Sequence, residues 1–214
     1  MRTATATLFF LLLCDGLSGC DTAQSPSDDE GAVDRLAPGV ACGRDAPPLE
    51  VPLRVLPSGV VPHWSTSAGC VTVSYAPDFA EQIEPLRAAM SGWTLDCSTL
   101  CFDGPVERAE APEAGAGERR LHVAWGPADV VNIEAEAFYD IDRGTIAQAL
   151  VRVPPDASPT VDDLLWAVGR ASGLGNPAGD VPSVMGTPDA SRVAPTEADA
   201  ATFCVLYGDP PLCP

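Results

Sequence analysis

The sequence has no lysine and only two histidines, His63 and His122, in 214 residues. All 12 basic side chains are therefore arginine, against 30 acidic ones, and the formal net charge is -18. A phosphate surface needs a cationic footprint, so this balance argues against nucleic-acid binding. The shortage of histidine and lysine also leaves few bases that could activate a serine or cysteine nucleophile.

Long apolar runs are scarce as well, and the one near the start of the chain predicts an export signal. Arg2 supplies a positive charge, and Thr7 to Leu13 is an apolar run too short to span a bilayer as a folded helix. Leu17-Ser18-Gly19-Cys20 resembles the lipobox of bacterial lipoproteins. We therefore expect residues 1–19 to be a signal peptide. Lipid on Cys20 would anchor the exported chain to the bacterial cell membrane or outer membrane.

Six cysteines remain once Cys14 is assigned to the signal and Cys20 to the anchor. An even number of cysteines in an exported chain predicts disulfides, with connectivities that the spacing leaves open. A zinc site is the weaker interpretation, because the closest pair has no second pair at a finger-like spacing. The disulfide candidates are Cys42, Cys70, Cys97, Cys101, Cys204 and Cys213.

Composition divides the rest of the chain into a tether and a folded domain. Residues 20–62 are rich in Pro, Gly, Ser and Asp, and their early part is too polar to fold. Residues 49–61 are more apolar, and a disulfide from Cys42 would join them to the domain. Residues 63–214 are the predicted domain; the chain is 46% apolar and 20% charged, as globular proteins are.

Strand and helix patterns alternate along this domain. The predicted strands are 70–75, 121–125 and 146–153, and the predicted helices are 81–93, one beginning at Thr160 and one running from Thr196 to Gly208. Both threonines suit the N-cap position, and a polar loop is expected over 104–120. This alternation predicts an α/β or α+β domain.

Three side chains in these elements have ordinary structural interpretations. Met90 and Trp93 lie on the apolar face of the helix 81–93, so we expect them in the core rather than at a cofactor. His122 alternates with apolar neighbours in its strand, so we expect it on the opposite face, as a surface histidine.

The helix that begins at Thr160 carries a resemblance to a known family. It contains the segment Trp166 to Asn176, WAVGRASGLGN, and Ser183-Val184-Met185-Gly186 follows it. These segments resemble the zinc-binding helix and Met-turn of matrixin-type metzincin proteases, whose pattern is H-E-x-x-H-x-x-G-x-x-H. Gly173 matches the glycine that turns the chain toward the third ligand, and Met185 matches the Met-turn methionine.

The resemblance runs in matching order from residue 63 to about residue 210. His63-Trp64 with the strand 70–75 is similar to the first matrixin strand, and Ala88 to Trp93 is similar to the first helix. The segment from Pro195 to Gly208 is similar to the C-terminal helix. The resemblance therefore implies a metzincin-like fold, a twisted mixed sheet with three helices.

The residues that carry the family's chemistry are replaced in this chain. Trp166, Arg170 and Asn176 stand at the three histidine positions, and Ala167 stands at the position of the glutamate base. An indole has no usable lone pair, a guanidinium stays charged and accepts nothing, and an amide offers only its oxygen. We therefore expect no zinc, no other cofactor and no proteolysis.

The substituted positions are candidates for ligand binding instead. Trp166 and Arg170 are one helical turn apart and share a face. We expect Arg170 to stack on Trp166 and to attract a peptide carboxylate. The alternative is that Arg170 reaches solvent and Trp166 packs in the core.

An acidic group forms a second candidate site. Hard cations such as calcium prefer oxygen ligands, and paired carboxylates also serve hydrolases. A solvated acidic loop and strand edge is the favoured interpretation, because such runs are common. The residues are Glu134, Glu136, Asp140 and Asp142.

Three functions follow from these observations. The leading hypothesis is a lipid-anchored, catalytically inactive matrixin-like pseudoprotease that holds a peptide or protein ligand in the cell envelope. The alternative is a zinc metalloendopeptidase with a relocated metal site. A structural envelope lipoprotein is the third.

Overall fold

The computed structural model describes residues 49–111, 118–140, 142–186 and 188–208. The predicted signal peptide, Cys20 and most of the predicted tether lie outside these residues, as do Cys42 and Cys213.

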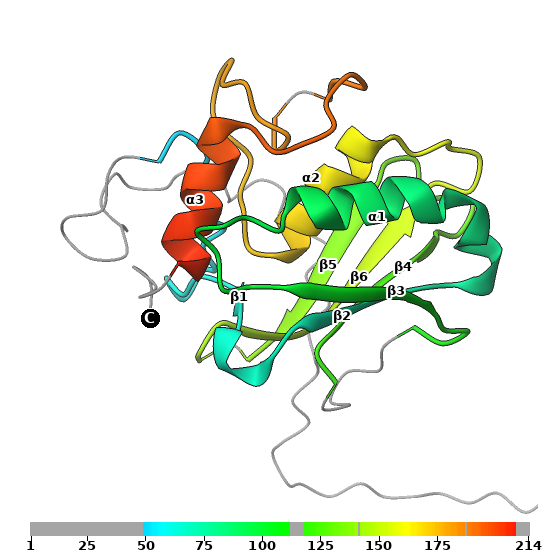
Figure 1. The fold of residues 1–214 in the computed structure, drawn as a ribbon, viewed down its shortest axis with the longest axis horizontal. Coiled ribbons are helices and arrows are strands. Elements are labelled where there is room, and N and C mark those ends of the chain that lie inside the picture. Colours follow the sequence, from blue (N-terminus) through cyan, green and yellow to red (C-terminus); the bar gives the residue numbers. More distant parts are fainter. Residues whose placement is uncertain (1–48, 112–117, 141, 187, 209–214) are drawn as a thin grey trace, which may run out of the picture. The chain divides into compact units, whose positions relative to one another are not determined.

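Six strands form one mixed sheet in the order β1-β6-β4-β2-β3, with β5 paired to β6 (Figure 1). β5 is antiparallel to β6, and every other pairing is parallel. The strands are β1 (His63–Trp64), β2 (Val71–Tyr75), β3 (Phe102–Glu107), β4 (Arg120–Trp125), β5 (Glu134–Tyr139) and β6 (Thr145–Val153).

Three α-helices accompany the sheet: α1 (Ile83–Gly92), α2 (Val161–Ala171) and α3 (Glu197–Tyr207). Two 3-10 segments, η1 (Thr66–Ala68) and η2 (Pro77–Gln82), connect the first strands and α1. Figure 1 shows α1 and α2 beside one another on one face of the sheet, and the two helices are in contact. This arrangement confirms the predicted α/β class with a mixed sheet and three helices. No helix in the described ranges has the length and apolar character to cross a membrane.

The apolar face of the sheet forms the core under the helices. Val73, Leu121 and Ala149 are in register across β2, β4 and β6, and all three are fully buried. Met90 and Trp93 are also buried, which confirms their predicted core role. The Trp93 ring packs against Phe203 with 4.8 Å between ring centroids, so α3 joins the same core.

His122 lies on the other face of the sheet, as its alternation predicts, but it is only 1% exposed. The prediction of a surface histidine was therefore wrong. β4 pairs in parallel with both β2 and β6, and parallel sheets are generally covered on both faces. The His122 Nδ1 atom is hydrogen-bonded to the hydroxyl of buried Ser74 at 2.9 Å.

Both predicted threonine N-caps are confirmed. Thr160 accepts the backbone N–H of Asp163, and the Asp163 carboxylate accepts the Thr160 N–H, so α2 begins with a full capping box. Thr196 and Asp199 form the same motif at the start of α3. Local side-chain chemistry thus determines where these two helices begin.

Residues 49–62, which the sequence interpretation placed in the tether, pack against the domain. Val51 and Leu53 are buried core side chains. The Thr202 hydroxyl of α3 donates to the Val51 carbonyl at 2.6 Å, and the Arg54 N–H donates to the Gly173 carbonyl at 2.8 Å. The apolar character of this segment therefore reflects core packing.

The predicted polar loop over 104–120 was wrong at its start, where the structure has strand β3. β3 lies at the end of the strand order and pairs with β2 alone among the described strands. Its side chains are mostly exposed, and an edge strand tolerates the proline at Pro105 because one side of its backbone needs no partner. Because most of its side chains are exposed, this edge strand lacks the alternation of apolar and polar residues that indicates a strand in a sequence.

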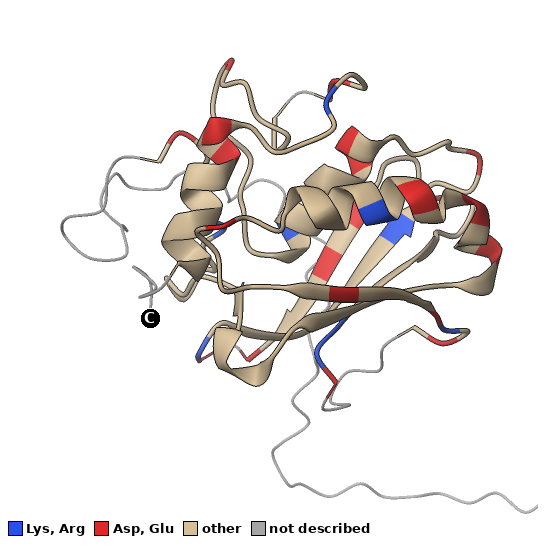
Figure 2. Ribbon diagram, in the orientation of Figure 1, with Lys and Arg blue, Asp and Glu red and all other residues tan. Residues whose placement is uncertain are grey.

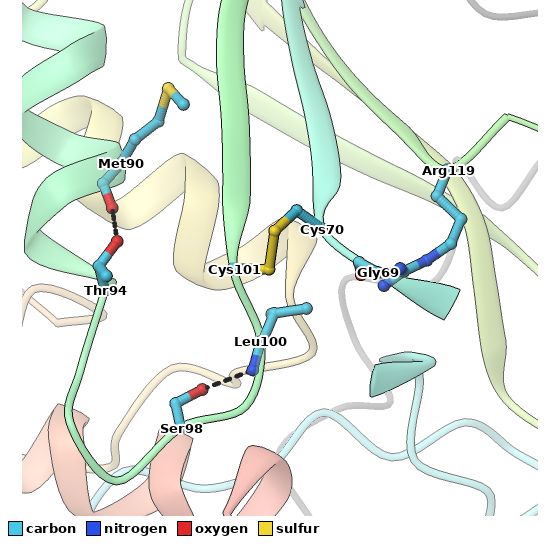
Figure 3. The surroundings of a disulfide bond; sticks show 8 residues. All are labelled: Gly69, Cys70, Met90, Thr94, Ser98, Leu100, Cys101 and Arg119. Carbon is cyan, nitrogen blue, oxygen red and sulfur yellow. Dashed lines mark hydrogen bonds between the residues drawn. A yellow bond between two sulfur atoms is a disulfide. The ribbon is translucent and has the colours of Figure 1, made fainter. Parts of the chain in front are cut away.

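Within the described residues, the disulfide candidates Cys70, Cys97, Cys101 and Cys204 form two pairs. Cys70 and Cys101 join the residues that precede β2 and β3, as Figure 3 shows. Cys97 and Cys204 join the segment after α1 to α3, across 107 residues of sequence. The predicted oxidation is thus confirmed for these cysteines.

Candidate functional site

The C-terminal half of α2 is held by close contacts. Gly169 faces Met185 and Trp93, and an added Cβ would lie 2.7 Å from the sulfur of Met185 and equally close to the Trp93 ring. Gly173 has φ +93°, and a Cβ there would collide with the Pro62 carbonyl oxygen. Both glycines are therefore required by packing, and Met185 lies directly against the helix.

The turn that carries Met185 is fixed by Asp199 of α3. The buried Asp199 carboxylate accepts the Ser183 hydroxyl and the Val184 N–H, the latter at 2.9 Å. Ser183 Oγ in turn accepts the Met185 N–H at 2.8 Å. The same carboxylate caps α3 through Thr196. One aspartate thus connects this turn to the start of a helix.

The four positions that the resemblance aligns with zinc ligands and the base differ in burial. Trp166 is half-buried, Ala167 is buried in the core, and Asn176 is exposed beyond the helix. The Nη1 atom of half-buried Arg170 lies 3.5 Å from the Leu174 carbonyl oxygen, at the C-terminal end of α2. The predicted stacking of Arg170 on Trp166 stays a prediction.

The donors at these positions do not fit a zinc ion. An indole, an alkyl group, a guanidinium and an exposed amide supply no imidazole, thiolate or carboxylate. Within the described ranges no three His, Cys, Asp or Glu side chains are grouped so that they could hold a metal ion.

An open pocket of about 210 Å³ lies beside the first turns of α2. Three segments that are distant in sequence build it: the residues before β5, the N-terminal half of α2, and the turn around Met185. Its walls include Asn132, Ile133, Asp162, Asp163, Trp166 and Val184. Of these, only Trp166 was a candidate from the sequence.

The two aspartates in the pocket wall have structural contacts of their own. Asp162 Oδ2 accepts the Asp189 N–H at 2.7 Å, and Oδ1 lies 3.5 Å from Arg192 Nη1. Burial raises the pKa of the Asp162 carboxyl, against the opposing effects of the Asp189 N–H and the Arg192 charge. Asp163 uses Oδ2 for the α2 cap.

The carboxylates of the acidic group over 134–142 make separate contacts. Arg152 lies 3.0 Å from Glu136 and 3.7 Å from Glu134, along the β5 and β6 pair. Asp140 accepts the backbone N–H groups of Asp142 and Arg143 in a turn. These contacts fit the strand-edge interpretation and supply no cluster for calcium among the described residues.

The buried His122 and Ser74 pair does not form a second site. Burial, and to a lesser extent the Arg120 charge, lowers the pKa of His122 to about 4. The pair is neutral near pH 7, and both side chains are almost fully buried, so a ligand has no access to them.

Comparison with known proteins gives one kind of match. No protein-family model matches the sequence, and no curated protein matches it. A similar solved structure is high choriolytic enzyme 1, a hatching-enzyme zinc protease from the medaka fish Oryzias latipes. The two are 9% identical with a TM-score of 0.44, over 73% of this chain and 98% of that one.

Proposed function

We propose that this chain is a matrixin-like domain that binds a peptide or protein segment without cutting it. The observation that carries the proposal is the pocket beside α2, which Trp166 lines at a position where the resembled family has a zinc ligand. A lipid on Cys20 would hold this binding module at the cell envelope.

The free edge of β5 supports an extended ligand. β5 pairs with β6 on one side, and no other described strand pairs with it. Asn132 and Ile133 lead into β5 and also line the pocket. A peptide that adds to this edge would gain backbone hydrogen bonds, and one of its side chains would enter the pocket.

The loss of cleavage in this proposal follows from the residue chemistry. Ala167 has no carboxylate that could activate water, and Trp166 and Arg170 supply no metal donor. Binding needs only surface and hydrogen-bond complementarity, which these substitutions leave intact.

Binding of fluorescent random decapeptides to the purified domain tests the proposal. We expect saturable binding with intact peptide recovered afterwards by mass spectrometry. Peptides N-methylated on alternate amides should lose affinity for one parity only, because an extended strand presents every second N–H to its neighbour. Stoichiometric zinc together with peptide cleavage would overturn the proposal in favour of the metalloendopeptidase.

Two matched variants localise the binding. Trp166→Leu should weaken it at least tenfold, whereas Trp125→Leu should not. Trp125 is also half-buried, but it lies on β4, where it packs against Phe79 at 4.8 Å between ring centroids. Equal effects of the two variants would place the ligand elsewhere.

A further inference from the structure

One side of the N-terminal half of α2 combines two carboxylates with an aromatic ring. Asp163 and Trp166 are three residues apart, and Asp162 and Trp166 are four apart, so all three share a helix face. All three also line the pocket. Carboxylates beside an indole are the groups that recognise an organic cation.

Asp162 lines this pocket and contributes negative charge to it. It is 2% exposed, and its Oδ1 atom has no hydrogen-bond partner in the described structure. Its nearest cation, Arg192, donates to the Ser183 carbonyl at 2.8 Å and reaches Oδ1 only at 3.5 Å. The Asp162 carboxylate therefore acts on a pocket ligand through its charge.

Asp163 keeps one carboxylate oxygen outside the helix cap. Its hydrogen bonds to the Thr160 N–H and hydroxyl, both at 2.8 Å, use Oδ2 alone. Oδ1 belongs to the same pocket-lining side chain. A planar donor group could therefore contact this oxygen without breaking the helix cap.

We propose that the pocket receives the guanidinium of an arginine side chain in the bound peptide, stacked on Trp166, hydrogen-bonded to Asp163 and attracted by the charge of Asp162. This inference rests on the proposed peptide binding and names its specificity. A guanidinium matches both features, since it stacks on aromatic faces and donates in a planar fork to carboxylates.

The size of the pocket and the charge of the chain agree with this occupant. Sites for drug-sized ligands span roughly 300–1,000 Å³, so about 210 Å³ suits one long side chain better. The net charge of -18 attracts cationic peptides over a distance. Figure 2 shows acidic positions far outnumbering basic ones on the described chain.

This specificity is the opposite of the one expected from Arg170. The Arg170 guanidinium lies near the Leu174 carbonyl, four residues beyond it, whereas the pocket is built by the first turns of the helix. An acidic peptide would meet the two aspartates there rather than a cation.

The test compares decapeptides that differ at one central residue: arginine, its neutral analogue citrulline, norleucine or glutamate. We expect the arginine peptide to bind about tenfold more tightly than the citrulline peptide, which corresponds to about 1.4 kcal/mol. The preference should shrink as salt is added. Equal binding of the four peptides would overturn the inference and leave peptide binding standing. If no peptide binds, both proposals fail.

Variants assign the preference to the pocket. Asp162→Asn and Asp163→Asn keep an oxygen that can accept the structural N–H groups, and each should reduce the preference for arginine over citrulline to about twofold or less. Glu81→Gln removes an exposed charge from η2 and should leave the preference unchanged. Thermal unfolding of each variant confirms that it is folded. A tenfold preference that survives both aspartate variants would place the guanidinium elsewhere.

Discussion

The two halves of α2 differ in what surrounds them. The C-terminal half is packed so closely that glycine is required against Met185 and the Pro62 carbonyl. The N-terminal half opens onto a pocket with polar walls and a half-buried indole. The first region leaves no room for a larger side chain, whereas Trp166 in the second borders the open space of the pocket.

Close packing makes any change at the two glycines and at Met185 costly in stability. The pocket side depends only on which groups are presented. Substitutions in the closely packed half should therefore reduce stability more than ligand binding. Substitutions on the pocket side should reduce ligand binding more than stability.

Gly173→Ala should have the largest effect, a loss of about 3 kcal/mol in unfolding free energy. The new Cβ meets the Pro62 carbonyl oxygen, and the backbone has φ +93°, so overpacking adds to left-handed strain. Gly179→Ala is the matched control, because Gly179 has φ +76° with open space around it. It should cost about 1–2 kcal/mol. Urea unfolding measures both, and equal losses would contradict the packing argument.

Lowering the pH should reduce the free energy of unfolding, because His122 in the central sheet must then be protonated. The pKa of His122 is lowered to about 4 in the folded state, against an ordinary value near 6.5. In the unfolded chain His122 therefore binds a proton at a higher pH than it does in the folded chain. The folded state keeps its full stability above pH 6.5 and loses part of it as the pH falls toward 4. The loss is up to about 3 kcal/mol.

The His122→Gln variant tests this assignment by urea unfolding between pH 7 and 4. Its stability should fall less steeply than that of the wild type, because the titrating group is gone. His63→Gln should keep the wild-type slope, since it retains His122. Parallel curves for all three proteins would contradict the assignment.

Much of the packed region could be predicted from local signals. Thr160 and Thr196 determine helix starts within four residues of sequence, and the alternation in 121–125 identifies a strand without outside information. Gly173 and Met185 were identified through the family pattern. For the two helix starts and the strand, the cause of the structure lies in the segment itself.

The errors and omissions share a long-range cause. The burial of His122 depends on what covers its face of the sheet, which the alternation within 121–125 does not reveal. Residues 49–62 are held by α3 and by the end of α2. The pocket joins Ile133, Asp162 and Val184 from three separate segments. No single stretch of sequence contains these contacts, so no pattern within one could indicate them.

Asp199→Ala should cost more stability than Asp163→Ala, although both residues complete the same capping motif. Asp163 supports one helix start, worth about 1 kcal/mol. Asp199 also holds Ser183 and Val184 in the Met185 turn, and its loss leaves buried donors unpaired, so we expect about 2–3 kcal/mol. Urea unfolding of the pair is the measurement. A cost for Asp199→Ala no larger than that for Asp163→Ala would show that the turn does not depend on it.

Trp166→Leu should have the smallest effect on stability, below about 1 kcal/mol, because the ring is half-buried in a pocket wall. Trp93→Leu, which truncates a fully buried ring that packs against Phe203, should cost about 3 kcal/mol. The order should reverse for peptide affinity, with Trp166→Leu weakening binding at least tenfold and folded Trp93→Leu protein binding normally. Unfolding and peptide-titration measurements on both variants would show this reversal in the order of the two effects. If Trp166→Leu destabilised the fold as much as Trp93→Leu and left peptide affinity unchanged, the indole would belong to the core, and the two halves of α2 would share one structural role.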